Sequence, residues 1–184
     1  MTITQARKTL LTDSGMWAVW EPAYFSHVVD YESWEKELIE DASILHHVST
    51  GALVPINLHS DGVYEFELRI GDLTEPATLS QREKSLLVVS SAFYKLKVRR
   101  KICVSGLEYI GQHIDEELTA CLVAPTNTYA VSAHIIEWDK EEDSKDINGN
   151  PSSNALPDFV ILANQVVNES NIEYAESLET FPKP

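Results

Sequence analysis

Apolar residues at every second position make the stretch from Gly51 to Gly71 the clearest structural signal in the chain. The alternation stops at Asp61-Gly62, a pair typical of tight turns because glycine tolerates a positive φ, and then resumes. The alternating apolar residues are Ala52, Val54, Ile56 and Leu58 before the turn, and Tyr64, Phe66, Leu68 and Ile70 after it. The pattern predicts a β-hairpin within a larger antiparallel sheet, since a lone ribbon is only marginally stable.

Alternating or continuous apolar runs predict further strands. They lie at 9–11 and 16–20, interpreted as a second ribbon, and at 93–98, 102–104, 120–123, 129–138 and 159–163. The segment 129–138 is apolar on both faces, which indicates a central strand. The basic face of 93–98 has the same period as the acidic face of the hairpin. We therefore expect Lys95 and Lys97 to lie opposite Glu65 and Glu67.

A change to helical spacing follows Asp30, which is well suited to cap a helix. Apolar residues at three- and four-residue steps predict one long helix from about Tyr31 to His47; they are Trp34, Leu38, Ala42 and Leu45. The segment 79–88 fits either a helix or a strand, because β-branched residues follow its polar start.

The predicted fold is α+β and mainly β: an antiparallel sheet or two-layer β-sandwich of about eight strands with one main helix. With 184 residues, 43% of them hydrophobic, the chain suits a single domain spanning 1–184. The polar segment 139–157 is expected to be a loop. The acidic tail from about residue 168 has few apolar anchors, and we expect it to be partly flexible.

The charge of the chain favours a cationic partner. Its 29 acidic residues outnumber 14 basic ones, giving a net charge of −15, and seven of the basic residues fall between Arg82 and Lys101. Acidic segments therefore flank a basic island. They would repel nucleic acid and steer a basic protein toward themselves, although solubility alone is an alternative explanation.

Three acidic segments are candidates for a protein-binding surface, because aromatic anchors among charges provide both contact energy and steering. The first is the run Glu137, Trp138, Asp139, Glu141, Glu142 and Asp143. The second is Asp115, Glu116 and Glu117, which is expected to join the same surface. The third is the acidic helix with Glu37, Glu40 and Asp41. The alternative for Trp138 is an inward orientation.

Catalytic signatures are weak throughout the sequence. It lacks the Gly-x-Ser-x-Gly elbow, the Walker loop, the dinucleotide fingerprint and the His-Glu-x-x-His motif, and we expect no cofactor and no metal. His134, beside Ser132 on one strand face, is the only plausible general base. Cys103 and Cys121 are the only plausible thiol nucleophiles, and a reducing compartment is the simpler assumption for two cysteines.

Together these features predict a non-enzymatic acidic binding protein, most specifically a cytoplasmic inhibitor of a basic protein. In charge and size the chain is similar to bacterial immunity proteins, which cover the cationic active sites of toxic nucleases. This resemblance implies an immunity-type protein that neutralises a basic protein such as a toxin nuclease. Two alternatives are an enzyme or small-molecule binder with a pocket around His134 and a cysteine, and a homo-oligomeric structural module. No apolar run is long enough to span a membrane, so no membrane partner is expected.

Overall fold

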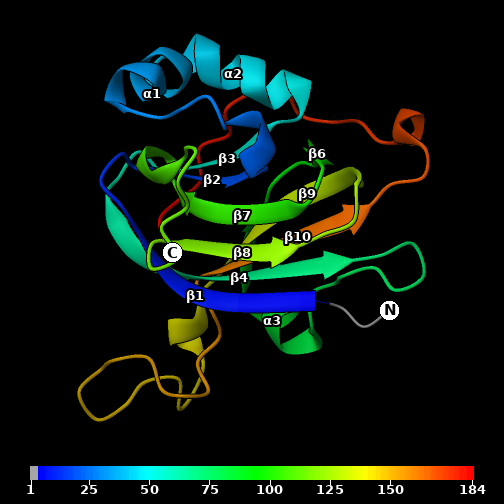
Figure 1. The fold of residues 1–184 in the computed structure, drawn as a ribbon. Helices are drawn as coiled ribbons and strands as arrows, with labels where there is room; N and C mark the ends of the chain where they lie inside the picture. The colour runs from blue at the N-terminus through cyan, green and yellow to red at the C-terminus, as the bar shows by residue number, and fades with distance from the viewer. Residues whose placement is uncertain (1–3) are drawn as a thin grey trace.

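The computed structural model describes residues 4–184 and contains two β-sheets packed face to face (Figure 1). One sheet has the order β1-β4-β10-β9-β5, with β6 also paired to β9, and the other has the order β3-β2-β7-β8. The strands are β1 (Thr4–Thr12), β2 (Met16–Trp20), β3 (Leu53–Asn57), β4 (Gly62–Gly71), β5 (Leu87–Ser90), β6 (Tyr94–Val98), β7 (Lys101–Gly106), β8 (Thr119–Val123), β9 (Asn127–Ile136) and β10 (Phe159–Gln165). The predicted mainly β, α+β class is confirmed. One pair, β4 with β10, is parallel.

The helices are α1 (Tyr31–Leu38), α2 (Asp41–Thr50) and α3 (Gln81–Ser85), with 3-10 turns η1 (Pro22–Tyr24), η2 (Leu107–Tyr109), η3 (Trp138–Lys140) and η4 (Glu169–Asn171). In Figure 1, α1 and α2 lie above the four-stranded sheet, while α3 and the loop after β9 lie below the six-stranded sheet. One end of the molecule is therefore formed by α1 and α2, and the opposite end by α3 and the loop after β9.

The hairpin predicted for Gly51–Gly71 is wrong, although both of its strands exist. β3 pairs with β2 in one sheet, and β4 pairs with β1 in the other. The ribbon predicted for 9–20 is wrong in the same way. β1 and β2 together form one bent arm, and β3 and β4 form a second. The two arms pair with each other as one long ribbon that runs from one sheet into the other. Alternation indicates which face of a strand is buried. The same alternation arises whether two consecutive strands pair as a hairpin or continue through a bend into different sheets.

The bend between β1 and β2 depends on Gly15. Its φ is +69°, and a Cβ there would lie 2.7 Å from the backbone nitrogen of Ser60 in the facing arm. Leu58 N donates to Gly15 O at 3.0 Å, so the two bends lie against each other. The carboxylate of Glu108 closes the corner by accepting from Asp13 N at 2.7 Å and from Ser14 Oγ at 2.7 Å.

The core lies between the sheets and is rich in aromatic rings. Phe66 and Phe159 stack with ring centroids 4.6 Å apart, and Trp17 packs against Phe66 at 5.6 Å. β9 is buried along almost its whole length, which confirms the central strand predicted from 129–138. A second apolar cluster that includes Ile136 and Val160 is buried beneath the α3 side. The sheet is thus covered on both faces.

The strand predicted at 93–98 is confirmed as β6, but its predicted partner is wrong. β6 pairs with β9, where Lys95 lies opposite Ala130 and Lys97 opposite Thr128. Glu65 instead forms an ion pair with Arg7 at 2.6 Å, and Glu67 with Arg69 at 2.7 Å. The matching periods of two charged strand faces therefore did not identify neighbours.

The single long helix predicted from Tyr31 to His47 is wrong, because the chain forms two helices that meet at Ile39 and Glu40. The break changes the helical phase, so the buried residues of α2 include Ile44 and Val48 instead of Ala42 and Leu45. The capping role predicted for Asp30 is confirmed: it accepts from Ser33 N at 2.9 Å. The undecided segment 79–88 contains both alternatives, α3 and the start of β5.

The expectation of reduced cysteines is also wrong. Cys103 and Cys121 lie opposite each other on β7 and β8 and form a disulfide. The tail from residue 168 runs back along the sheets, where Phe181 is buried and its N–H donates to Asn57 O at 2.8 Å. Residues 1–3 of the expected domain lie outside the described residues. Among residues 4–184, no helix has both the length and the apolar character needed to cross a bilayer.

Candidate protein-binding surface

A groove of about 680 Å³ runs between α1 and the segment that follows β7. Its apolar lining comes from both sides and includes Val28, Val29, Tyr31, Trp34, Ile39 and Ile110. Asp30, Glu108 and Asp115 add carboxylates to the same lining. The groove therefore combines an apolar surface with negative charge at the helical end of the molecule.

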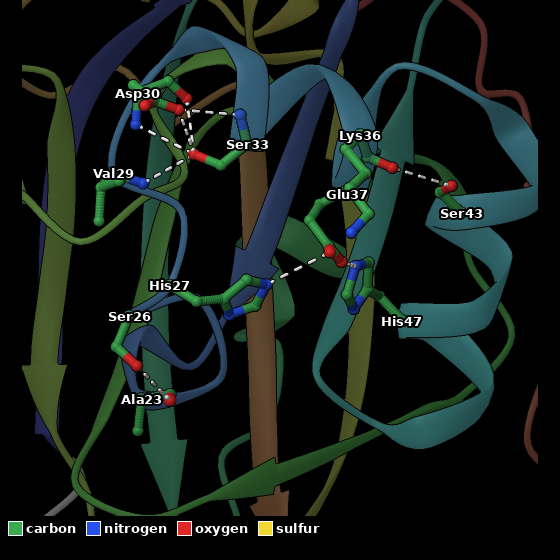
Figure 2. Close-up of polar contacts among 10 residues, drawn as sticks. All are labelled: Ala23, Ser26, His27, Val29, Asp30, Ser33, Lys36, Glu37, Ser43 and His47. Carbon is green, nitrogen blue, oxygen red and sulfur yellow. Dashed lines mark hydrogen bonds and ion pairs between the residues drawn. The ribbon is translucent and has the colours of Figure 1, made fainter.

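Three contacts fix the walls of this groove. Trp34 Nε1 in α1 donates to Leu107 O at 3.0 Å, and Gln112 N donates to Val28 O, just before α1, at 2.8 Å, so residues 28–34 and the 107–115 segment are joined at two points. At the start of α1, Asp30 and Ser33 form a capping box (Figure 2). The hydrogen bonds from Ser33 lower the pKa of Asp30, which keeps this carboxylate ionised at neutral pH.

Large apolar side chains are exposed at the groove. The exposed fraction is 69% for Tyr31, 56% for Val29 and 48% for Ile39. The rings of Tyr31 and Trp34 stack with centroids 6.0 Å apart. A cluster of exposed apolar residues beside charged ones is typical of protein interaction sites.

Acidic residues dominate the two segments that form this end. Residues 26–50 contain six acids and one lysine, and residues 107–118 contain four acids and neither lysine nor arginine. We call these two segments together the acidic end. They include the predicted site residues Glu37, Glu40, Asp41, Asp115, Glu116 and Glu117.

Glu37 plays a structural role within the acidic end. Its carboxylate lies between two histidines, 3.0 Å from His47 Nε2 and 3.4 Å from His27 Nε2 (Figure 2). Burial lowers the pKa of His47, although Glu37 acts in the opposite direction. Ser43 Oγ donates to Lys36 O at 3.3 Å and joins α2 to α1 nearby. By contrast, Glu40 and Asp41 at the helix junction are exposed.

The predicted site residues Glu137 to Asp143 lie at the opposite end, in the segment below the six-stranded sheet (Figure 1). Three of their carboxylates are paired within the chain: Glu137 with Lys140 at 2.7 Å, Asp139 with Lys145 at 3.3 Å, and Glu141 with Arg82 at 2.6 Å. Glu142 and Asp143 are exposed. The carboxylates of this segment are thus largely neutralised by local bases.

Trp138 is not exposed as an aromatic anchor for a partner. Its ring is half-buried, and Nε1 donates to Asp158 Oδ1 at 2.7 Å. Burial raises the pKa of Asp158. The inward orientation, considered above as the alternative, is the one found.

The structure does not bring Asp115, Glu116 and Glu117 together with the Glu137 to Asp143 run. Lys8 Nζ donates to the carbonyl of Glu116, while the guanidinium of the neighbouring Arg7 donates to Ala155 O at 2.6 Å. Successive side chains of a strand point to opposite faces, so β1 separates the two segments. The expectation of one joint surface is therefore wrong.

The residues of the enzymatic alternative do not converge either. His134 is buried in the six-stranded sheet, where its Nδ1 lies 2.7 Å from Ser90 Oγ and its Nε2 lies 2.9 Å from Ser132 Oγ. Burial lowers its pKa to about 4. Both cysteines lie in the other sheet and are joined to each other. Within residues 4–184, no group of three or more potential side-chain ligands could hold a metal ion.

Sequence reasoning missed the groove residues Val29, Tyr31, Trp34 and Ile110 as site candidates. Trp34 was expected to lie on the buried face of the helix. The signal for the others was the short apolar-acidic mixture at residues 28–34, where Val29 and Tyr31 flank the capping Asp30. Their exposure depends on where the 107–115 segment packs, which has no local signature.

No family model and no curated protein sequence matches the chain. The solved structures that match include one described as "Crocagin biosynthetic gene J", with a TM-score of 0.59 and 14% identity over 90% of this chain and 99% of that one. Another is ComJ from Bacillus subtilis, described as an inhibitor of the DNA-degrading activity of NucA, with a TM-score of 0.49 and 10% identity over 90% of this chain and 100% of that one. The first likeness shows a shared fold alone, and a TM-score below 0.5 supports no conclusion.

Proposed function

We propose that this protein is a non-enzymatic binding protein that captures a basic protein on its acidic end and inhibits it. The observation that carries the proposal is the apolar groove, whose lining includes Asp30, Glu108 and Asp115 and whose walls belong to two segments with ten acidic residues and one lysine. The acids attract a cationic partner over about one Debye length, roughly 8–10 Å at physiological salt. The exposed apolar side chains then supply burial energy on contact.

A nuclease is the kind of partner that this surface suits. Nucleases bind a polyanion and therefore carry cationic surfaces, which an acidic protein can cover in place of nucleic acid. On this basis we propose an immunity-type or inhibitory role. The charge of the acidic end supports the basic character of the partner.

The acidic end supports this role better than the Glu137 to Asp143 run does. Carboxylates already paired with lysine or arginine on the same chain attract a partner less strongly. Breaking such an ion pair would also offset part of the free energy gained from a new contact with the partner. Residues 26–50 and 107–118 contain Lys36 as their one lysine and no arginine, although Glu37 is engaged by His27 and His47. We therefore place the partner at α1, α2 and the 107–115 segment.

The experiment is affinity capture from the protein's own cells with two matched variants. One carries Glu32→Gln, Glu35→Gln and Asp41→Asn in the acidic end, and the other carries Glu75→Gln, Glu142→Gln and Asp143→Asn elsewhere. All six residues are exposed, and each variant loses three charges. The expected result is a basic protein that the wild type and the second variant retain and the first variant releases, and whose activity the wild type inhibits.

Two results would contradict the proposal. One is a captured partner that both variants retain equally, because the acidic end would then contribute no specific attraction. The other is a partner with an acidic binding surface. Light scattering on the purified protein tests the alternative of a homo-oligomeric structural module, since a homo-oligomer would give a mass above that of the 20.7 kDa chain.

A further inference from the structure

The groove at α1 has carboxylate oxygens that other contacts leave available. Asp115 accepts from Glu117 N at 2.8 Å through Oδ1, and Asp30 accepts from Ser33 through Oδ1. Within residues 4–184, no hydrogen bond engages Oδ2 of either residue. Glu108 differs, since both of its oxygens accept from the corner at residues 12–14. Asp30 and Asp115 are thus the groove carboxylates free to accept from a ligand.

The stacked rings of Tyr31 and Trp34 lie in the same groove. A planar cation gains energy over the face of an aromatic ring, and arginine does so more often than lysine. Val29 and Ile39 add exposed apolar surface on which the methylene stem of a long side chain can pack. The positive end of the α1 dipole is offset by the Asp30 cap.

We infer that the groove is the pocket for one arginine side chain that the partner presents on its surface. The stem lies on the apolar lining, the guanidinium faces the Tyr31 and Trp34 rings, and its N–H groups donate to Asp30 and Asp115. This inference rests on the proposed function and names the group that the acidic end recognises. Charge complementarity commits the occupant to a cation, and the stacked rings select arginine over lysine.

The test uses a blocked pentapeptide with one central arginine between two leucines on each side. Binding is followed by the NMR signals of the tryptophan indole N–H groups and the backbone amides of the full chain. We expect a saturable shift of the Trp34 indole and of the amide of Gly111, which also lines the groove, while the half-buried Trp138 at the other end serves as an internal control. Replacing arginine by lysine should weaken binding about threefold or more, and replacing it by uncharged citrulline about tenfold.

Variants of the protein test the assigned contacts. Asp115→Asn and Tyr31→Ala should each weaken peptide binding about three- to fivefold, because each removes one exposed charged or cation-π contact. Both side chains belong to the surface of the groove, so the fold is expected to be retained. Glu142→Gln is the matched control and should leave the affinity unchanged.

The inference is overturned if the citrulline peptide binds as well as the arginine peptide, if the shifts centre on Trp138, or if Asp115→Asn has no effect. Retention of the captured partner by the variants then shows whether only the arginine pocket fails or the proposed function fails as well. A partner released by the Glu32, Glu35 and Asp41 variant but retained by the Tyr31 and Asp115 variants would keep the acidic end as the binding surface. It would remove the arginine pocket.

Discussion

Protonation of His134 should destabilise the fold in mildly acidic solution. Its side chain is 8% exposed, both ring nitrogens lie within hydrogen-bonding distance of serine hydroxyls, and burial lowers its pKa from 6.5 to about 4. Glu83 acts to raise this pKa, and Arg69 acts to lower it further. The folded state therefore strongly prefers the neutral imidazole.

The sign and size of the effect follow from linkage. A base with a lowered pKa contributes stability that is complete above its unfolded pKa, near 6.5, and is lost as the pH falls toward 4. A difference of about 2.5 pKa units corresponds to roughly 3 kcal/mol in total, of which about 2 kcal/mol is lost by pH 5.

The assay is urea unfolding at pH 7.5 and pH 5.0 for the wild type and for His134→Gln. His47 and Asp158 also have shifted pKa values, but they are present in both proteins and cancel in the difference. We expect the wild type to lose about 2 kcal/mol more than the variant between the two pH values. Equal losses in the two proteins would refute the assignment of His134 as a buried, neutral structural residue.

Three further changes test the fold. Gly15→Ala should destabilise by about 2–4 kcal/mol in thermal unfolding, since it combines a positive φ with a backbone clash, whereas Gly149→Ala, which has open space, should cost only about 1 kcal/mol. Glu21→Gln should cost about 2 kcal/mol in urea unfolding, because the buried carboxylate accepts from three backbone N–H groups at 99–101. Reducing the Cys103–Cys121 disulfide should lower the unfolding free energy by about 3 kcal/mol, and an unchanged midpoint would contradict this.

The sequence predicts strand positions well because alternation reflects burial directly. β9 and β10 were expected from continuous apolar runs, and both are covered on two faces. Strand partners were not predictable in the same way. The Asp61-Gly62 pair suggested a hairpin turn, but the pairing is decided by the bend at Gly15 and by the insertion of α1 and α2 between β2 and β3.

The candidate surface was predictable in its charge but not in its shape. Asp115 and the acids of the predicted helix follow from composition along the chain. The groove requires that the 107–115 segment pack beside α1, a contact made through Trp34 and Val28 between residues far apart in sequence. The ion pair of Glu141 with Arg82 likewise joins segments far apart in sequence, so the sequence could not show that this acid is neutralised.

The measurement that tests the central proposal most directly is the association rate of the captured basic partner as a function of salt. Between about 20 and 300 mM salt, we expect the wild-type rate to fall roughly tenfold or more. The variant neutralised at Glu32, Glu35 and Asp41 should bind more slowly at low salt and with a flatter salt dependence, while the variant changed at Glu75, Glu142 and Asp143 should stay closer to the wild type. A wild-type rate that does not change with salt would contradict the proposal that the acidic end attracts the partner.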